Sequence, residues 1–117
     1  MSTVVPVIGD INKYVIKVTW EGITTTNSDG DWIELPHYPE KTIQIDGNFG
    51  TGGELTIQGK NVDSYTPFVL SDFRGESLVK LANYGGNISE NPLKIRPVLT
   101  AGSGSVDLDI TIICVQK

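Results

Sequence analysis

The stretch Val106-Asp-Leu-Asp-Ile-Thr-Ile-Ile-Cys-Val115 decides the fold class of this chain. Its apolar residues at positions 106, 108, 110, 112 and 114 alternate with Asp107, Asp109 and Thr111. Successive side chains of a β-strand point to opposite faces, so this alternation predicts a strand with one buried face and one wet face. Because Ile113 and Val115 are apolar as well, we expect the end of the strand to be covered on both faces.

Short runs of the same kind recur along the chain at spacings of about ten residues. They cover residues 14–20, 32–35, 41–46, 54–59, 67–70, 77–82 and 93–99; a single helical turn is the alternative for residues 77–82, where the neighbouring strands favour a strand. No apolar periodicity is sustained over the roughly 10–12 residues that a helix would need. We therefore predict an all-β fold, a two-sheet antiparallel β-sandwich or jelly roll with seven to nine short strands.

Turn residues between these runs predict how the strands connect. The glycine-rich segment 47–53 joins strands 41–46 and 54–59 and predicts a hairpin, and residues 101–105 are predicted to form a Gly/Ser turn between strands 93–99 and 106–115. Pro97 has no backbone N–H, which predicts an edge or a bulge at that position. Residues 84–92 are expected to form a loop. Residues 1–12 are predicted to form an N-terminal arm, followed by a single β-sandwich domain over residues 13–117.

The charge balance argues against several classes of partner. The 117 residues include 14 acidic and nine basic side chains, for a formal net charge of −5, and the basic residues are scattered. A surface that binds nucleic acid needs clustered Lys and Arg, so we expect no nucleic acid partner, and nothing attracts the chain to an anionic membrane. The N-terminus lacks the features of a signal peptide, so we expect the protein to remain in the cytoplasm unless a larger assembly carries it out.

The residues that most often carry catalysis are scarce. His37 is the only histidine, in a loop between Pro36 and Tyr38, and Cys114 is the only cysteine, inside the apolar final strand. A nucleophilic thiol needs a nearby base or cation and access to substrate, and Cys114 is expected to be buried with neither. The sequence therefore predicts that the protein is not an enzyme.

Three further motifs have ordinary explanations. Gly50-Thr-Gly-Gly53 lacks the Lys-Ser/Thr of a phosphate loop and precedes a strand. Asn27-Ser-Asp-Gly-Asp31 has oxygen ligands at alternate positions but departs from the calcium-loop spacing, so a solvated turn is favoured over a Ca²⁺ site completed from elsewhere. Asp107 and Asp109 share one strand face at a spacing that a glycosidase could use, but this alternation is also how any strand keeps one face exposed to water. We expect no cofactor and no metal.

Two segments resemble a known group of proteins. Ile43-Gln-Ile-Asp-Gly-Asn-Phe-Gly-Thr-Gly-Gly-Glu-Leu-Thr-Ile-Gln-Gly-Lys-Asn-Val-Asp63 is similar to the strand–"GxFGG"–strand–"GSNDG" core of small β-sandwich proteins encoded among phage and prophage structural genes. Ile95-Arg-Pro-Val-Leu-Thr-Ala-Gly-Ser-Gly-Ser-Val-Asp-Leu-Asp-Ile-Thr-Ile113 resembles their closing "IRP-V-x-GG-G-x-x-L-x-V" hairpin. The chain departs from the pattern at Gly59-Lys-Asn-Val-Asp63, where the usual Ser and closing Gly are missing.

The resemblance implies a structural role in a phage particle. It implies a capsid decoration (cement) protein that binds the major capsid protein as a homotrimer, on the capsid surface of a virion assembled in the host bacterial cytoplasm. A carbohydrate-binding or structural module of a phage tail or neck is the alternative. Aromatic residues in loops suit interfaces, whereas aromatics that cap the sandwich core would be buried. The predicted interface residues are Phe49, Phe73, Tyr84, Trp32 and Tyr38.

Overall fold

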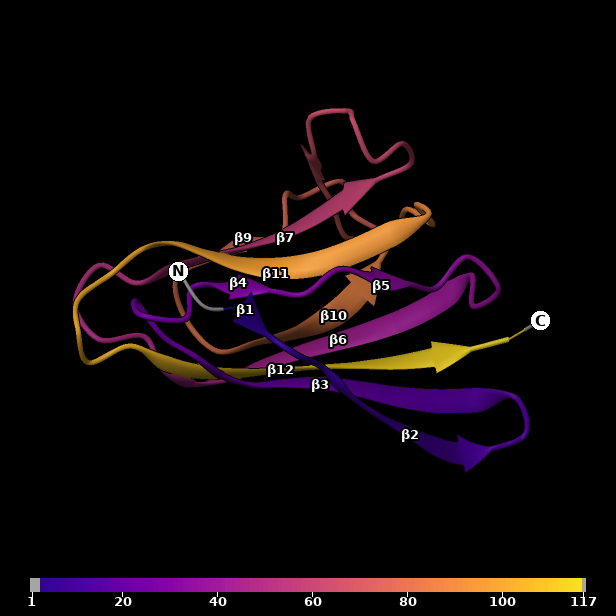
Figure 1. Cartoon of the computed structure of the whole chain (residues 1–117), viewed down its shortest axis with the longest axis horizontal. Helices are drawn as coiled ribbons and strands as arrows, with labels where there is room; N and C mark the ends of the chain where they lie inside the picture. The colour runs from indigo at the N-terminus through magenta and orange to yellow at the C-terminus, as the bar shows by residue number, and fades with distance from the viewer. Residues whose placement is uncertain (1–2, 117) are drawn as a thin grey trace.

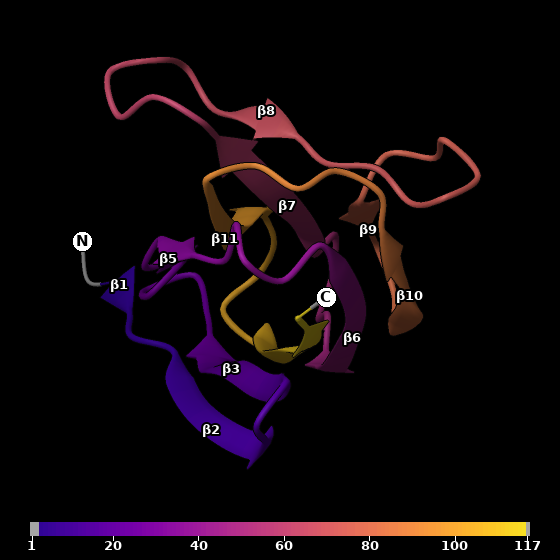
Figure 2. The ribbon, with the colours of Figure 1, turned by 90° about the vertical axis from the view of Figure 1, so that its right-hand side faces the viewer.

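Two β-sheets packed face to face make up the fold in the computed structural model, which describes residues 3–116. The first sheet has the strand order β1-β4-β11-β7-β8, and β5 and β9 add to the flanks of β11 and β7. The second has the order β10-β6-β12-β3-β2. Figure 1 shows the two layers one above the other, and Figure 2 looks along them. Neighbouring strands are antiparallel except for the parallel pair β1 and β4, which confirms the predicted all-β sandwich.

Twelve strands occur in residues 3–116. Seven have five residues or more, in agreement with the predicted seven to nine, and five have only two residues each. The longer strands are β2 (Val7–Asn12), β3 (Val15–Ile23), β6 (Glu40–Asn48), β7 (Glu54–Lys60), β10 (Tyr84–Ile88), β11 (Lys94–Ala101) and β12 (Asp107–Val115). The short strands are β1 (Thr3–Val4), β4 (Asp29–Gly30), β5 (Ile33–Glu34), β8 (Phe68–Val69) and β9 (Val79–Lys80).

The core between the sheets is built by the alternation that the sequence displays. On β12, Leu108, Ile110, Ile112 and Cys114 are buried, while Asp107 and Asp109 face solvent. The same pattern buries Val18 and Trp20 on β3, Ile43 and Ile45 on β6, and Leu55 and Ile57 on β7 of the opposite sheet. Ile113 and Val115 are half-buried, so the last residues of β12 are partly covered on the second face too.

The predicted hairpin over residues 41–59 and the closing hairpin that the resemblance implies are both wrong. β6 and β7 do not pair with each other, and neither do β11 and β12, because each glycine-rich connection crosses from one sheet to the other. β6 pairs with β12 in the second sheet and β7 pairs with β11 in the first, so the two connections lie side by side as stacked arches. The Thr51 amide of one arch donates to Ser103 Oγ of the other at 3.2 Å. Each strand thereby buries its apolar face against the opposite sheet, which a tight hairpin within one sheet would not achieve.

Two predictions about irregular segments also need correction. Pro97 lies in β11, an interior strand, and not at an edge or bulge. Its missing N–H is tolerated because the neighbouring strand is interrupted there: β4 pairs with Val98 and β5 with Lys94 and Ile95, which leaves no ladder partner beside Pro97. Residues 84–88 of the predicted loop form β10, which pairs with β6 despite its two glycines.

The predicted N-terminal arm is described from residue 3 onwards, and residues 1, 2 and 117 lie outside the described residues. Within it, β1 pairs with β4 of the first sheet, and β2 pairs with β3 at an edge of the second. The segment from residue 3 to residue 12 therefore spans the margin between the two sheets, as Figure 2 shows.

Candidate functional site

The most exposed apolar strand of the described chain is β2. All six of its residues are exposed, and Val7, Ile8 and Ile11 keep 61%, 56% and 56% of their surface accessible. β3 covers one side of β2, and no strand covers the other side. Figure 2 shows the β2–β3 hairpin projecting beyond the first sheet, which leaves both faces of β2 open. Exposed apolar side chains on a free sheet edge mark a surface that can pair with another chain.

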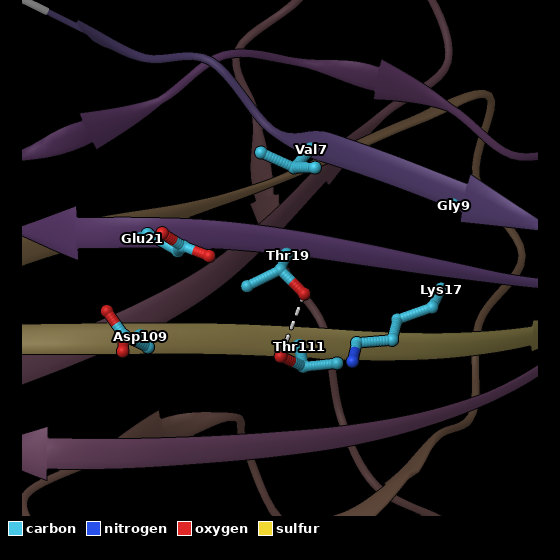
Figure 3. A pocket seen from close by; sticks show the side chains of 7 residues that line it. All are labelled: Val7, Gly9, Lys17, Thr19, Glu21, Asp109 and Thr111. Atoms are coloured by element: carbon cyan, nitrogen blue, oxygen red, sulfur yellow. Dashed lines mark hydrogen bonds between the residues drawn. The ribbon is translucent and has the colours of Figure 1, made fainter.

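A shallow groove of about 410 Å³ runs over the outer face of the second sheet beside β2 (Figure 3). Its lining comes from β2, β3 and β12 and consists of Val7, Gly9, Lys17, Thr19, Glu21, Asp109 and Thr111. Thr19 Oγ1 and Thr111 Oγ1 are hydrogen-bonded at 3.1 Å across the floor. None of these lining residues is aromatic, so the groove lacks a ring on which a sugar could stack.

Acidic residues gather at the arch end of the same face. Asp109 lies opposite Asp46 in the β6–β12 ladder, and Asp107 lies two residues along the same strand. Asp109 Oδ1 accepts a hydrogen bond from the Gly22 amide at 3.0 Å, which gives this carboxylate a structural role at the β3 bulge. Among residues 3–116, no group of three or more His, Cys, Asp or Glu side chains is arranged to hold a metal ion.

The loop that the sequence marked as a weak calcium candidate is occupied by internal contacts. The Asn27 amide donates to Thr24 Oγ1, and the Trp20 indole donates to the Asp31 carbonyl oxygen. Asp29 Oδ2 lies 3.8 Å from a guanidinium nitrogen of Arg96. These contacts are those of a structural turn and ion pair.

The five predicted interface residues do not form one surface. Phe49, Tyr38 and Tyr84 are half-buried and pack against the core, whereas Phe73 is 66% exposed. Trp32 is half-buried, and both Lys60 Nζ and the Arg96 guanidinium carbon lie 4.5 Å from the centre of its ring. The structure brings together only Phe73 and Tyr84, which line a hollow of about 130 Å³ beside β10.

A second exposed apolar surface surrounds β8 and was not singled out by the sequence. Val62, Tyr65, Phe68 and Val69 are 41%, 67%, 41% and 43% exposed. We call these four residues the β8 patch. Figure 2 shows β8 and its flanking loops on the side of the molecule opposite to β2. The aromatic residues Tyr65 and Phe68 were the available signal, but the sequence does not tell which loop aromatics stay exposed.

Asp72 organises the loop that leads towards β9. Its Oδ1 accepts hydrogen bonds from the amides of Arg74 and Glu76, and its Oδ2 accepts one from the Tyr84 hydroxyl at 3.2 Å. Burial by itself would raise the pKa of Asp72, but these hydrogen bonds together outweigh it and the pKa is lowered. Burial and the adjacent Asp72 carboxylate raise the pKa of Tyr84.

The fold places a cation beside the single cysteine, which the sequence did not reveal. Lys41 is paired with Cys114 in the β6–β12 ladder, and both side chains are buried. Burial lowers the pKa of Lys41, whose ammonium donates to Asn91 Oδ1. Burial also raises the pKa of the Cys114 thiol to about 11, although Lys41 acts in the opposite direction. A buried thiol with a raised pKa is poorly suited to nucleophilic chemistry, and His37 lies exposed in its loop.

Comparison with known proteins places the fold but not a family. No protein-family model matches the chain, and no curated protein matches its sequence significantly. Among solved structures, the crystal structure of SPBc2 prophage-derived protein YomS is similar, with a TM-score of 0.65 at 18% sequence identity. The superposition covers 92% of this chain and 100% of that chain. The likeness shows that the two proteins share a fold.

In residues 3–116, no helix is long and apolar enough to cross a membrane.

Proposed function

We propose that this protein is a structural component of a phage particle and that it decorates the assembled head, where it binds the major capsid protein as a homo-oligomer without catalysing a reaction. The observation that carries the proposal is the presence of two separate exposed apolar surfaces, β2 and the β8 patch, on edges of different sheets. A decoration protein needs one surface for its own copies and another for the capsid. The shared fold with a prophage-derived protein supports a phage origin.

Other features are compatible with this role. Among the described residues, the buried side chains are apolar apart from Lys41, Thr56 and Asp72, as suits a small domain that has to stay folded on a particle. The formal net charge of −5 gives no affinity for packaged nucleic acid. The carbohydrate-binding alternative is less well supported, because the groove beside β2 has no aromatic lining and Trp32 is already in contact with two cations.

Copy number on purified particles tests the proposal. Quantitative mass spectrometry of particles from the phage or prophage that encodes the chain should find it in a fixed, high ratio to the major capsid protein. A low copy number confined to tails would refute decoration and favour the tail or neck alternative.

A matched pair of variants tests the β8 patch. Tyr65→Asp places a charge in the patch, and Leu81→Asp places one at a residue of nearly equal exposure, 66% against 67%, outside it. We expect Tyr65→Asp to abolish binding to heads that lack the protein, whereas Leu81→Asp should bind normally. Equal binding by both variants would remove the patch from the proposal.

A further inference from the structure

We propose that β2 pairs antiparallel with β2 of a second copy of this chain, about a two-fold axis that passes through Gly9, so that the second sheets of two copies join into one continuous sheet. The proposal concerns self-association and does not depend on where in a particle the protein acts.

β2 is the edge best suited to such pairing. The edges of the first sheet are formed by β1, β5, β8 and β9, which have only two residues each. At the other edge of the second sheet, the loop that carries Phe73 and Arg74 lies against β10 and encloses a hollow with it. β2 instead offers six exposed residues, contains neither Lys nor Pro, and pairs regularly over Val7–Asp10, before the bulge between Asp10 and Asn12.

The backbone of β2 has unused hydrogen-bonding groups on its free side. Hydrogen-bonded and non-hydrogen-bonded pairs alternate along an antiparallel ladder. The Gln116 amide donates to the Tyr14 carbonyl oxygen, so the even-numbered residues of β3 bond to β12 and the odd-numbered residues face β2. Lys17 and Thr19 are paired with Gly9 and Val7, which leaves the N–H and C=O groups of Ile8 and Asp10 directed to the open edge.

These free groups define a register that is complementary to itself. With Gly9 opposite Gly9, Ile8 of each copy lies opposite Asp10 of the other, and the free groups of the two residues meet. Moving the two-fold axis by one residue, which slides the partner strand by two residues, would in one direction place Asp10 opposite Asp10, where like charges repel. A shift in the other direction would place Asp10 opposite Pro6, which has no N–H to donate. Gly9 has open space around the position that a Cβ would occupy, so the partner strand can approach closely.

Side chains on both faces support the same register. Ile8 lies opposite the buried Val18 of β3, at the margin of the core. In the proposed pair, the two Ile8 side chains are diagonal neighbours, within reach of one another across the strands. Val7 of one copy then lies beside the bulge that contains Ile11 of the other. Side chains that are 56–61% exposed in the single chain would become covered.

A two-fold contact differs from the trimer that the phage resemblance implies. A ring of three would need each β2 to meet a different surface, such as β10, of the next copy. Light scattering of the full chain separates the two: the proposal predicts a species of twice the 12.7 kDa chain mass that dissociates on dilution. A trimer mass, or a monomer at every concentration up to the solubility limit, would overturn it.

Charge substitutions at Ile8 test the register itself. Ile8→Asp places two pairs of carboxylates opposite each other, so we expect the dissociation constant to rise about tenfold or more. Ile8→Lys removes the same apolar side chain but places Lys opposite Asp10, so this variant should remain dimeric. The double variant Ile8→Asp with Asp10→Lys restores an opposite-charge pair and should recover the dimer.

The outcomes are distinct from those of a simple hydrophobic contact. If Ile8→Asp and Ile8→Lys weaken association equally and the double variant fails to recover it, the proposed register is wrong. Thermal unfolding of each variant serves as the folding control, since Ile8 is mostly exposed. Hydrogen exchange gives an independent readout: the Ile8 and Asp10 amides should be protected in the wild-type dimer and exchange freely in the Ile8→Asp variant.

Discussion

Replacing Gly53 by Ala tests the stacked arches that distinguish this fold from a pair of hairpins. A Cβ at Gly53 would lie 2.1 Å from the carbonyl oxygen of Phe49 and 3.0 Å from its carbonyl carbon. Carbon and oxygen atoms of this kind approach to about 3.3 Å, so the arch would have to open by roughly 1.2 Å. The obstructing atoms belong to the backbone and cannot rotate away.

The free-energy cost can be worked from these contacts. Overpacking at a rigid site costs about 1–3 kcal/mol. An opened arch would also lose the hydrogen bond from the Thr51 amide to Ser103 Oγ of the neighbouring arch, which contributes about 1 kcal/mol. We therefore expect Gly53→Ala to lower the free energy of unfolding by about 3 kcal/mol, which corresponds to a fall in Tm of roughly 10 °C.

Urea unfolding measured by tryptophan fluorescence provides the assay, because Trp20 is fully buried. Gly104→Ala is the matched control in the neighbouring arch, where a Cβ would meet nothing within 4 Å. This control should be within about 0.5 kcal/mol of the wild type. If Gly53→Ala is as stable as Gly104→Ala, the connection between β6 and β7 does not have the arch geometry and the reasoning fails.

Three further predictions concern buried groups. In the unfolded chain Cys114 has its ordinary pKa of 9.0, whereas in the folded protein its pKa is about 11. Between these pH values only the unfolded chain loses the proton, so the wild-type free energy of unfolding should fall by roughly 2–3 kcal/mol as pH rises. Urea titrations of Cys114→Ala should lack this fall. Asp72→Ala should speed hydrogen exchange of the Glu76 amide roughly tenfold. Because the pKa of Asp72 is lowered from 3.8, the difference should be present above that pH and vanish as acid protonates the folded carboxylate. Gly30→Ala would place a Cβ 2.6 Å from Pro97 Cδ, so the free energy of unfolding measured in urea should fall by about 1–3 kcal/mol. Gly9→Ala is the control and should unfold like the wild-type monomer, because a Cβ there meets nothing within 4 Å.

The alternation of apolar and polar residues correctly predicted which side chains are buried, but it did not predict which strands pair with each other. Ile43, Ile45, Leu55 and Ile57 are all buried, as their period of two requires. That period states which side chains share a face, but it is the same for a hairpin within one sheet and for an arch between two sheets. The glycine-rich segment 47–53 is long enough for either connection, so the partner strands came only from the tertiary structure.

Strands without an apolar alternation were missed for a related reason. β10 contains Gly85 and Gly86 and was expected to be a loop, but the free edge of β6 supplies the hydrogen bonds that hold it. β2 is likewise held by the edge of β3 within a segment predicted to be an arm. A sheet edge can recruit a segment whose own sequence has little β-propensity, because the backbone groups make the bonds.

The sequence also does not determine which of the predicted interface residues are exposed. Aromatic type and loop position selected Phe49, Phe73, Tyr84, Trp32 and Tyr38, but the exposure of an aromatic ring depends on what the rest of the chain places over it. Three of the five rings pack against the core, and Trp32 is held by Lys60 and Arg96, which the sequence places far from it.

The sequence by itself determined the all-β class, the inward faces of the main strands and the burial of Cys114, because these depend on residue type and a period of two along one strand. Only the tertiary structure decided that the glycine-rich connections are arches, that Lys41 lies beside Cys114 and that β2 is left as an open apolar edge. Each of these depends on which strands become neighbours. That choice is made by packing two sheets around one core, and no local pattern encodes it.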